Sequence, residues 1–287
     1  MNYPTIVTMF YNIRKIDKTH INDNRQKINY IELAQQFILK LPYPIIFFID
    51  DEDTEIYESI YNARKSNELF KFTNIIKINL KNTYFYKYLA RLEELQSQFI
   101  IHNGNLKHET PLYIILNNNK FFFMEKAIDL NPFNSTHFIW MDFGINHVAK
   151  NTELIHEWIT QIPDKIKQLC INPYIENAEP KKHFQTIWHN CAGGLFSGSK
   201  ENLNKYIRLF KKKTEQIYNE GWYQIDEAVM TMVQRENIEL FDFYYGDYEG
   251  IISNYLKPVH SWGLINTNMT KCLNMNNTAF LYKMMFY

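Results

Sequence analysis

One aspartate follows an apolar run in the middle of the chain. Residues 138–141 are Phe, Ile, Trp and Met, Asp142 comes next, and Gly144 follows two positions later. Such a run is typical of a strand buried on both faces, and ligands bind in the crevice at the carboxyl ends of parallel strands. Asp142 is therefore a candidate ligand for a metal ion or a substrate, and Gly144 would let backbone approach it. The alternative is that Asp142 caps a helix or begins a turn.

Two earlier apolar runs also end in residues that could bind a ligand. The run 45–49 leads into four acids, of which Asp50 is the first. Asp50 could ligate a metal or a ribose hydroxyl, or it could belong to a solvated turn before a helix. The first run ends in Thr8, Phe10 and Tyr11, which could hold and stack on a base, although Phe10 is also a natural core residue.

The N-terminal half alternates between strand and helix patterns. β-Branched and aromatic residues predict strands at 5–11, 45–49 and 75–80, and apolar residues at helical spacing predict helices at 25–41 and 56–63. This order implies a parallel sheet with right-handed crossovers. Thr110 and Pro111 begin a helix that is expected to run to about Leu130.

The C-terminal half is expected to add further helices around the same sheet. The expected elements are a helix over 151–169, a short strand at 185–188, a Gly-rich loop over 189–199, helices over 199–219 and 224–235, and a strand over 238–245. No repeat or linker separates the halves, so we expect one domain over residues 1–287.

Composition excludes several classes of protein. Lys+Arg and Asp+Glu both number 31, so there is no basic excess of the kind that nucleic-acid binders show. The three cysteines have no metal-ligand spacing, and no stretch is long and apolar enough for a membrane span. The N-terminus shows no leader pattern, so we expect a cytoplasmic protein. The dinucleotide fingerprint and the Walker motif are both missing from the sequence.

A spaced set of motifs resembles the HtrL/YibB family from Thr5 to about Tyr255. The motifs are Tyr113, Lys120, Asn131-Pro132-Phe133, Phe138 to Gly144, Ala192 to Gly198, Asp226-Glu227, Phe241 and Tyr245-Gly246-Asp247-Tyr248. Members of that family look like glycosyltransferases of the GT-A type. The resemblance therefore implies an α/β, GT-A-like fold with a mixed, mostly parallel sheet, and a hexosyltransferase-like activity on a nucleotide-diphosphate sugar. It does not assign a retaining or an inverting reaction.

The resemblance also implies roles for particular residues in donor binding. In the GT-A type an aspartate such as Asp142 holds Mn²⁺ or Mg²⁺, which neutralises the donor diphosphate. The usual motif is Asp-x-Asp and here the second acid is replaced by Gly144. His260 is the expected second metal ligand, with Asp50 as an alternative, and the metal could also be dispensable. The alternative for His260 is an ordinary exposed loop histidine. Arg64 and Lys120 could meet phosphates, although surface roles are common for such residues.

The same resemblance assigns the acceptor side to the C-terminal half. One of Asp226 and Glu227 would contact the acceptor hydroxyl or the donor sugar. That carboxylate would be the general base if the enzyme inverts, or would stabilise an oxocarbenium-like centre if it retains. The alternative is that both acids simply complement a helix dipole. Gly193 and Gly194 would bring backbone close to the sugar. Residues 1–145 would bind the nucleotide and residues 146–287 a glycan or protein acceptor. Two alternatives are an inactive glycan-binding or partner-binding module and a nucleotidyltransferase, which would carry a Gly-rich and Arg-rich loop after its first strand.

Overall fold

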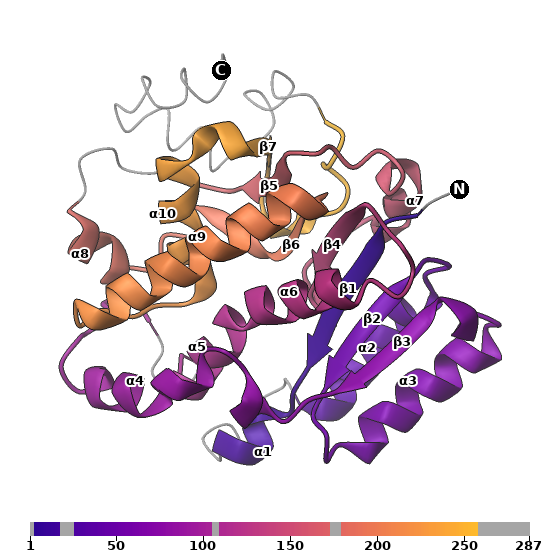
Figure 1. Ribbon diagram of the computed structural model, residues 1–287, viewed down its shortest axis with the longest axis horizontal. Coiled ribbons are helices and arrows are strands. Elements are labelled where there is room, and N and C mark those ends of the chain that lie inside the picture. The colour runs from indigo at the N-terminus through magenta and orange to yellow at the C-terminus, as the bar shows by residue number, and fades with distance from the viewer. Residues whose placement is uncertain (1–2, 18–25, 105–108, 173–178, 258–287) are drawn as a thin grey trace.

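Seven strands form one mixed sheet in the computed structural model, which describes residues 3–17, 26–104, 109–172 and 179–257 (Figure 1). The strands are β1 (Thr5–Phe10), β2 (Ile45–Ile49), β3 (Thr73–Lys77), β4 (His137–Met141), β5 (Ile166–Cys170), β6 (Cys191–Ser199) and β7 (Phe241–Tyr245). Their order across the sheet is β3-β2-β1-β4-β6-β5-β7. Strand β6 runs antiparallel to β4 and β5, and the other neighbouring pairs are parallel. The predicted α/β class with a mixed, mostly parallel sheet is confirmed.

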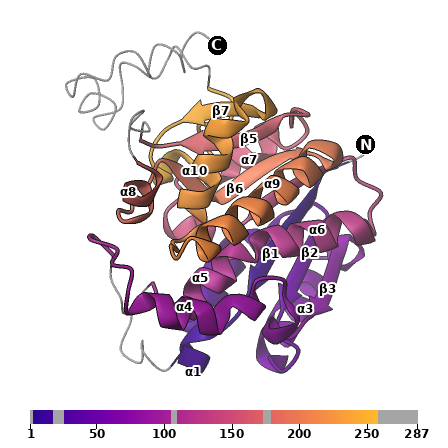
Figure 2. The same cartoon turned by 60° about the vertical axis from the view of Figure 1, so that its left-hand side comes forward.

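Helices cover both faces of this sheet, as Figures 1 and 2 show. One core contains residues of α4 (Leu89–Gln96), α5 (Pro111–Asn118), α6 (Lys120–Leu130), α9 (Lys200–Asn219) and α10 (Asp226–Glu236). The other core contains residues of α2 (Lys27–Gln36), α3 (Thr54–Ser66) and α7 (Ile155–Trp158). The short helices α1 (Ile13–Asp17) and α8 (Pro180–Phe184) complete the set of labelled α-helices.

Strand β4 is central and buried on both faces, as its composition predicts. Phe138 and Trp140 belong to one core, whereas Ile139 and Met141 belong to the other. Successive side chains of a strand point to opposite faces, so a strand between two helical layers needs apolar residues at every position. Asp142 is the first residue beyond this strand.

Two predicted elements of the C-terminal half are wrong. The expected helix over 151–169 is α7 followed by the strand β5, because Pro163 interrupts helical hydrogen bonding and residues 166–170 pair with β6 and β7. The expected strand at 185–188 is irregular. The strand lies instead in the Gly-rich segment, as β6.

Small residues in β6 allow close packing. A Cβ added to Gly198 would lie 2.9 Å from Cδ1 of Ile166 on the neighbouring strand, a distance that real side chains do not tolerate. The glycines that are typical of a loop in the sequence therefore allow close packing of neighbouring strands within a sheet. The tight fit explains why a segment with weak strand propensity forms a nine-residue strand.

The helix expected over 111–130 divides at Asn119. The Asn119 side-chain amide donates to the carbonyl of Ile115 at 2.9 Å, and its Oδ1 accepts the backbone N–H of Phe85 at 3.1 Å. A side chain that bonds local backbone in this way competes with the continuing helix. As a result Lys120 becomes the first residue of α6.

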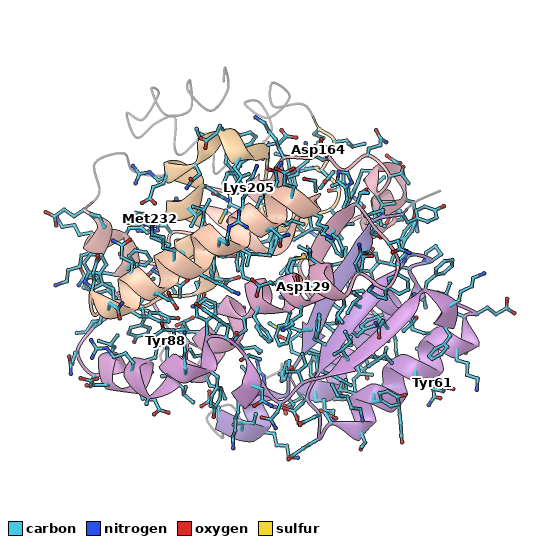
Figure 3. All side chains as sticks on the ribbon, viewed as in Figure 1. Tyr61, Tyr88, Asp129, Asp164, Lys205 and Met232 are labelled. Atoms are coloured by element: carbon cyan, nitrogen blue, oxygen red, sulfur yellow. The ribbon has the colours of Figure 1, made fainter. Side chains whose placement is uncertain are left out.

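Lys205 on α9, labelled in Figure 3, is an exposed charged residue on the outside of the helical layer. Within the described ranges, no helix combines the length and apolar character that a membrane crossing requires.

Candidate active site

The sheet brings Asp142 beside the Gly-rich start of β6. The backbone N–H of Asp142 donates to the carbonyl of Gly194 at 2.9 Å. This contact exists because β6 is antiparallel to β4, so the first residues of β6 meet the last residues of β4. The predicted residues Asp142, Gly193 and Gly194 therefore lie together at the carboxyl edge of the parallel strands.

Two donor groups hold the Asp142 carboxylate through three contacts. The indole Nε1 of Trp140 donates to Oδ1 at 2.8 Å, and the Lys120 ammonium lies 3.2 Å from Oδ1 and 3.3 Å from Oδ2. The Asp142 side chain is 39% exposed, so its remaining lone pairs are accessible from outside. The carboxylate is oriented by buried donors and open on one side.

Lys120 is a buried cation between two acids. Its side chain is 4% exposed, and Nζ lies 2.9 Å from Oδ2 of Asp226 and 3.1 Å from the carbonyl of Gly193. Burial alone would lower the pKa of Lys120, but the charges of Asp142 and Asp226 outweigh it and raise the pKa above its usual range. The ammonium therefore stays protonated and ties β4, β6 and α10 together.

Asp226 and Glu227 begin α10, and both side chains lie against Gly193. A Cβ added to Gly193 would lie 2.6 Å from Oδ2 of Asp226, so this position has no room for a side chain. Asp226 is buried against Lys120. Glu227 accepts the Gly193 backbone N–H at 3.0 Å and is 12% exposed.

Sequence reasoning missed two further residues around Glu227. The Tyr248 hydroxyl donates to both Glu227 oxygens, at 2.9 and 2.8 Å. Nδ1 of His189 lies 3.3 Å from Oε2 of Glu227 and 2.8 Å from the Tyr248 oxygen. The hydrogen bond to Glu227 raises the pKa of His189 above its usual value. The available sequence signals were the histidine directly before the Gly-rich segment and the Tyr245 to Tyr248 motif, but neither one specifies this contact.

A cavity of about 440 Å³ opens in front of Asp142. Its lining includes Phe10, Tyr11, Arg14, Lys120, Asp142 and Gly144. A Cβ added to Gly144 would lie 2.7 Å from Cδ1 of Tyr30, another lining residue. Position 144 therefore has no room for a side chain beside Tyr30. The structure thus places five of the predicted donor-binding residues on one cavity: Phe10, Tyr11, Lys120, Asp142 and Gly144.

Three other predicted residues lie elsewhere. Thr8 is fully buried within β1. Asp50 lines a separate cavity of about 570 Å³, where burial raises its pKa. Arg64 lies at the opposite, amino edge of the sheet, where it donates to backbone carbonyls just before β2 and β3. His260 falls outside the described residues.

The residues that are present suit a metal ion held mainly by its substrate. The described ranges hold no group of three or more His, Cys, Asp or Glu side chains that could bind a metal. Asp142 and Glu109 both bring a carboxylate to the cavity, and the Asp142 side chain, which Trp140 and Lys120 hold, is 39% exposed. Such a site fits a hard cation whose other ligands are oxygens of a bound diphosphate.

Comparison with known sequences gives one family. A family model described as a bacterial protein of unknown function (HtrL_YibB) matches residues 3–254. The protein HtrL of Escherichia coli (strain K12) is 21% identical over 257 residues, which cover 84% of this chain and 87% of that protein.

Solved structures with a similar fold are glycosyltransferases. Mouse xyloside xylosyltransferase 1 in its apo form aligns with a TM-score of 0.41 and 12% identity, covering 84% of both chains. The galactosyltransferase LgtC, in complex with donor and acceptor sugar analogs, aligns with a TM-score of 0.41 and 13% identity, covering 83% of this chain and 72% of the other.

Proposed function

The chain belongs to the HtrL/YibB family, and we propose that it transfers a sugar from a nucleotide-diphosphate sugar to a glycan or protein acceptor. The observation that carries the proposal is the Asp142–Lys120–Asp226 cluster, which opens into a cavity of about 440 Å³. A permanently charged ammonium and an open carboxylate at the carboxyl edge of a sheet suit a ligand that carries a diphosphate.

The donor is proposed to bind with its base near β1 and its diphosphate near Asp142. Phe10 and Tyr11 line the cavity and would stack against the base, an interaction worth roughly 1–3 kcal/mol. Lys120 would draw the negative charge of the diphosphate toward the cluster. In this proposal residues 1–145 bind the nucleotide and residues 146–287 bind the acceptor, within one domain.

Asp142 is the residue that would hold Mn²⁺ or Mg²⁺, with donor oxygens and His260 as further ligands. The metal would supply charge stabilisation for the departing diphosphate. Lys120 and Trp140 hold Asp142 in one orientation for that purpose. Asp142 therefore presents its free lone pairs toward the cavity.

Asp226 and Glu227 are proposed to serve the reacting sugar and the acceptor. Asp226 would fix the Lys120 ammonium near the diphosphate, and Glu227, which accepts the Gly193 N–H, would face the acceptor. The proposal also includes a cytoplasmic location, where thiols stay reduced, and both Cys170 and Cys191 are free thiols.

A thermal-shift panel of UDP-glucose, UDP-galactose, UDP-xylose and UTP, each with and without Mn²⁺, tests this function. A ligand that binds only the folded protein at 100 times its Kd adds about 2.7 kcal/mol of stability. We expect a UDP-sugar with Mn²⁺ to raise the melting temperature, and the same mixture to release UDP on incubation. Stabilisation by UTP alone would favour a nucleotidyltransferase. Binding without UDP release, with glycan acceptors present, would favour an inactive module.

A further inference from the structure

His189, Glu227 and Tyr248 form a polar cluster beside the Lys120 site. Their side chains come from the segment before β6, the start of α10 and the segment after β7. Glu227 links the two sites, because its Oε1 accepts the N–H of Gly193 while the carbonyl of Gly193 accepts from Lys120. The cluster is therefore joined to the proposed diphosphate site through the backbone of Gly193.

Hydrogen-bond accounting places a proton on Nδ1 of His189. An ionised carboxylate only accepts hydrogen bonds. The single proton of the Tyr248 hydroxyl is donated to Glu227, whose Oε1 and Oε2 lie 2.9 and 2.8 Å from the Tyr248 oxygen. A bare Nδ1 would then face a carboxylate oxygen at 3.3 Å without a proton between them. With Nδ1 protonated, the imidazole donates to Glu227 or Tyr248 and Nε2 carries the lone pair.

The backbone presents this imidazole in a strained conformation. His189 has φ of 47°, in the left-handed region that non-glycine residues rarely adopt, and the cost is on the order of 1 kcal/mol or more. The side-chain amide of Asn172 holds the carbonyl of His189 at 3.1 Å. The His189 side chain remains 49% exposed, and among the described residues no hydrogen bond engages Nε2.

We propose that His189 is the general base for the acceptor hydroxyl, with Glu227 as the residue that positions its imidazole. The proposal rests on the proposed function and deepens it. Nε2 takes the hydroxyl proton while the acceptor oxygen forms a bond to the anomeric carbon of the donor. The bond from that carbon to the diphosphate oxygen breaks, and the diphosphate leaves with the electron pair. This displacement inverts the anomeric configuration.

Glu227 supports the step in the way that the carboxylate of a catalytic triad supports its histidine. It fixes the tautomer and stabilises the imidazolium that forms. The groups facing His189 are Glu227, Tyr248 and, at longer range, the charge of Glu109. Because these acids raise the pKa of His189, the base is protonated at mildly acidic pH, and turnover should fall as the pH drops through that pKa.

The first test needs no substrate. NMR of the histidine rings, with His189 assigned from the spectrum of the His189→Gln variant, should show the neutral Nδ1–H tautomer and a pKa above the usual 6.5. Glu227→Gln should bring that pKa down. A neutral Nε2–H tautomer, or a pKa that Glu227→Gln leaves unchanged, would overturn the proposal.

The second test measures UDP release from the UDP-sugar that binds best, with water or a glycan as acceptor. His189→Gln should lower kcat by about 10²- to 10⁴-fold, remove the acid limb of the pH profile and leave the donor Kd unchanged. The matched control is His137→Gln, because His137 also pairs with a carboxylate, that of Asp164 at 3.1 Å, on the far edge of the sheet (Asp164 is labelled in Figure 3).

The outcomes separate the two proposals. If the wild type binds no nucleotide sugar, the proposed function fails, whatever the state of His189. If the wild type binds and turns over a donor but His189→Gln matches the wild type in kcat and pH profile, the general-base role is wrong. A product that retains the anomeric configuration would also overturn it.

Discussion

Arg64 and Lys120 are both buried cations in helices beside the sheet, and the sequence offers both as phosphate-binding candidates. Arg64 is fully buried and Lys120 is 3% exposed. Arg64 lies at the amino edge, where its guanidinium donates to the carbonyls of Leu41, Tyr43 and Phe72 and to the hydroxyl of Thr73. Lys120 lies at the carboxyl edge between two carboxylates.

The partners of the two cations differ in charge, and this difference distinguishes a structural cation from a candidate ligand-binding one. Burial lowers the pKa of Arg64 to about 10, because the charged guanidinium loses its hydration and its partners are neutral groups. The acids around Lys120 raise its pKa instead. Lys120 also lines a cavity with an open carboxylate, whereas the donors of Arg64 connect the starts of β2 and β3. Burial of a cation therefore does not by itself mark a binding site.

Replacing Lys120 should have the largest effect. Lys120→Met leaves Asp226 as an uncompensated buried charge, and breaking such a pair costs about 3–5 kcal/mol of unfolding free energy. Nucleotide affinity should also fall by about 10- to 100-fold, the value of one hydrogen bond to a charged group. Chemical denaturation and calorimetry with UDP would measure the two losses.

A double variant distinguishes these two losses. Lys120→Met combined with Asp226→Asn removes both charges, so stability should largely return while UDP affinity stays low. If UDP affinity returns together with stability, Lys120 is a structural cation like Arg64, and the contrast between the two sites disappears.

Replacing Arg64 should give a smaller loss, confined to stability. Arg64→Met leaves carbonyls of Leu41, Tyr43 and Phe72 without their donor, which we expect to cost about 3 kcal/mol in total. UDP affinity of the folded protein should match that of the wild type below the melting transition. A loss of affinity without loss of stability would show that Arg64 acts on the ligand site from a distance.

The sequence predicted the elements whose local pattern agrees with their environment. Strand β2 and residues 138–141 of β4 are continuous apolar runs, β1 is rich in β-branched and aromatic residues, and α9 has a capping Ser199 and a clear helical period. Strand β5 was hidden, because Ile155, Ile159, Ile162 and Ile166 also recur at helical spacing. Strand β6 could not be predicted, because its glycines are needed for close packing against residues such as Ile166 on the neighbouring strand. The local sequence pattern carries no information on that packing.

The candidate site was only partly predictable for a similar reason. The strand end identified Asp142 and the helix start identified Asp226. That Lys120 joins them depends on the break at Asn119, which the side chain of one asparagine creates. His189 and Tyr248 are 59 residues apart and meet only through the pairing of β5 with β6 and β7.

Calorimetric titration of UDP in the presence of Mn²⁺ tests the central claim most directly. Asp142→Asn keeps the shape of the side chain and removes its charge, and Asp164→Asn makes the same change at the opposite edge of the sheet. We predict that the wild type and Asp164→Asn bind UDP only with Mn²⁺, each ligand strengthening the other by the same factor. Asp142→Asn should stay folded and show no Mn²⁺-dependent binding. UDP binding that persists unchanged in Asp142→Asn, or that a chelator leaves intact in the wild type, would contradict the assignment of Asp142 as the metal ligand.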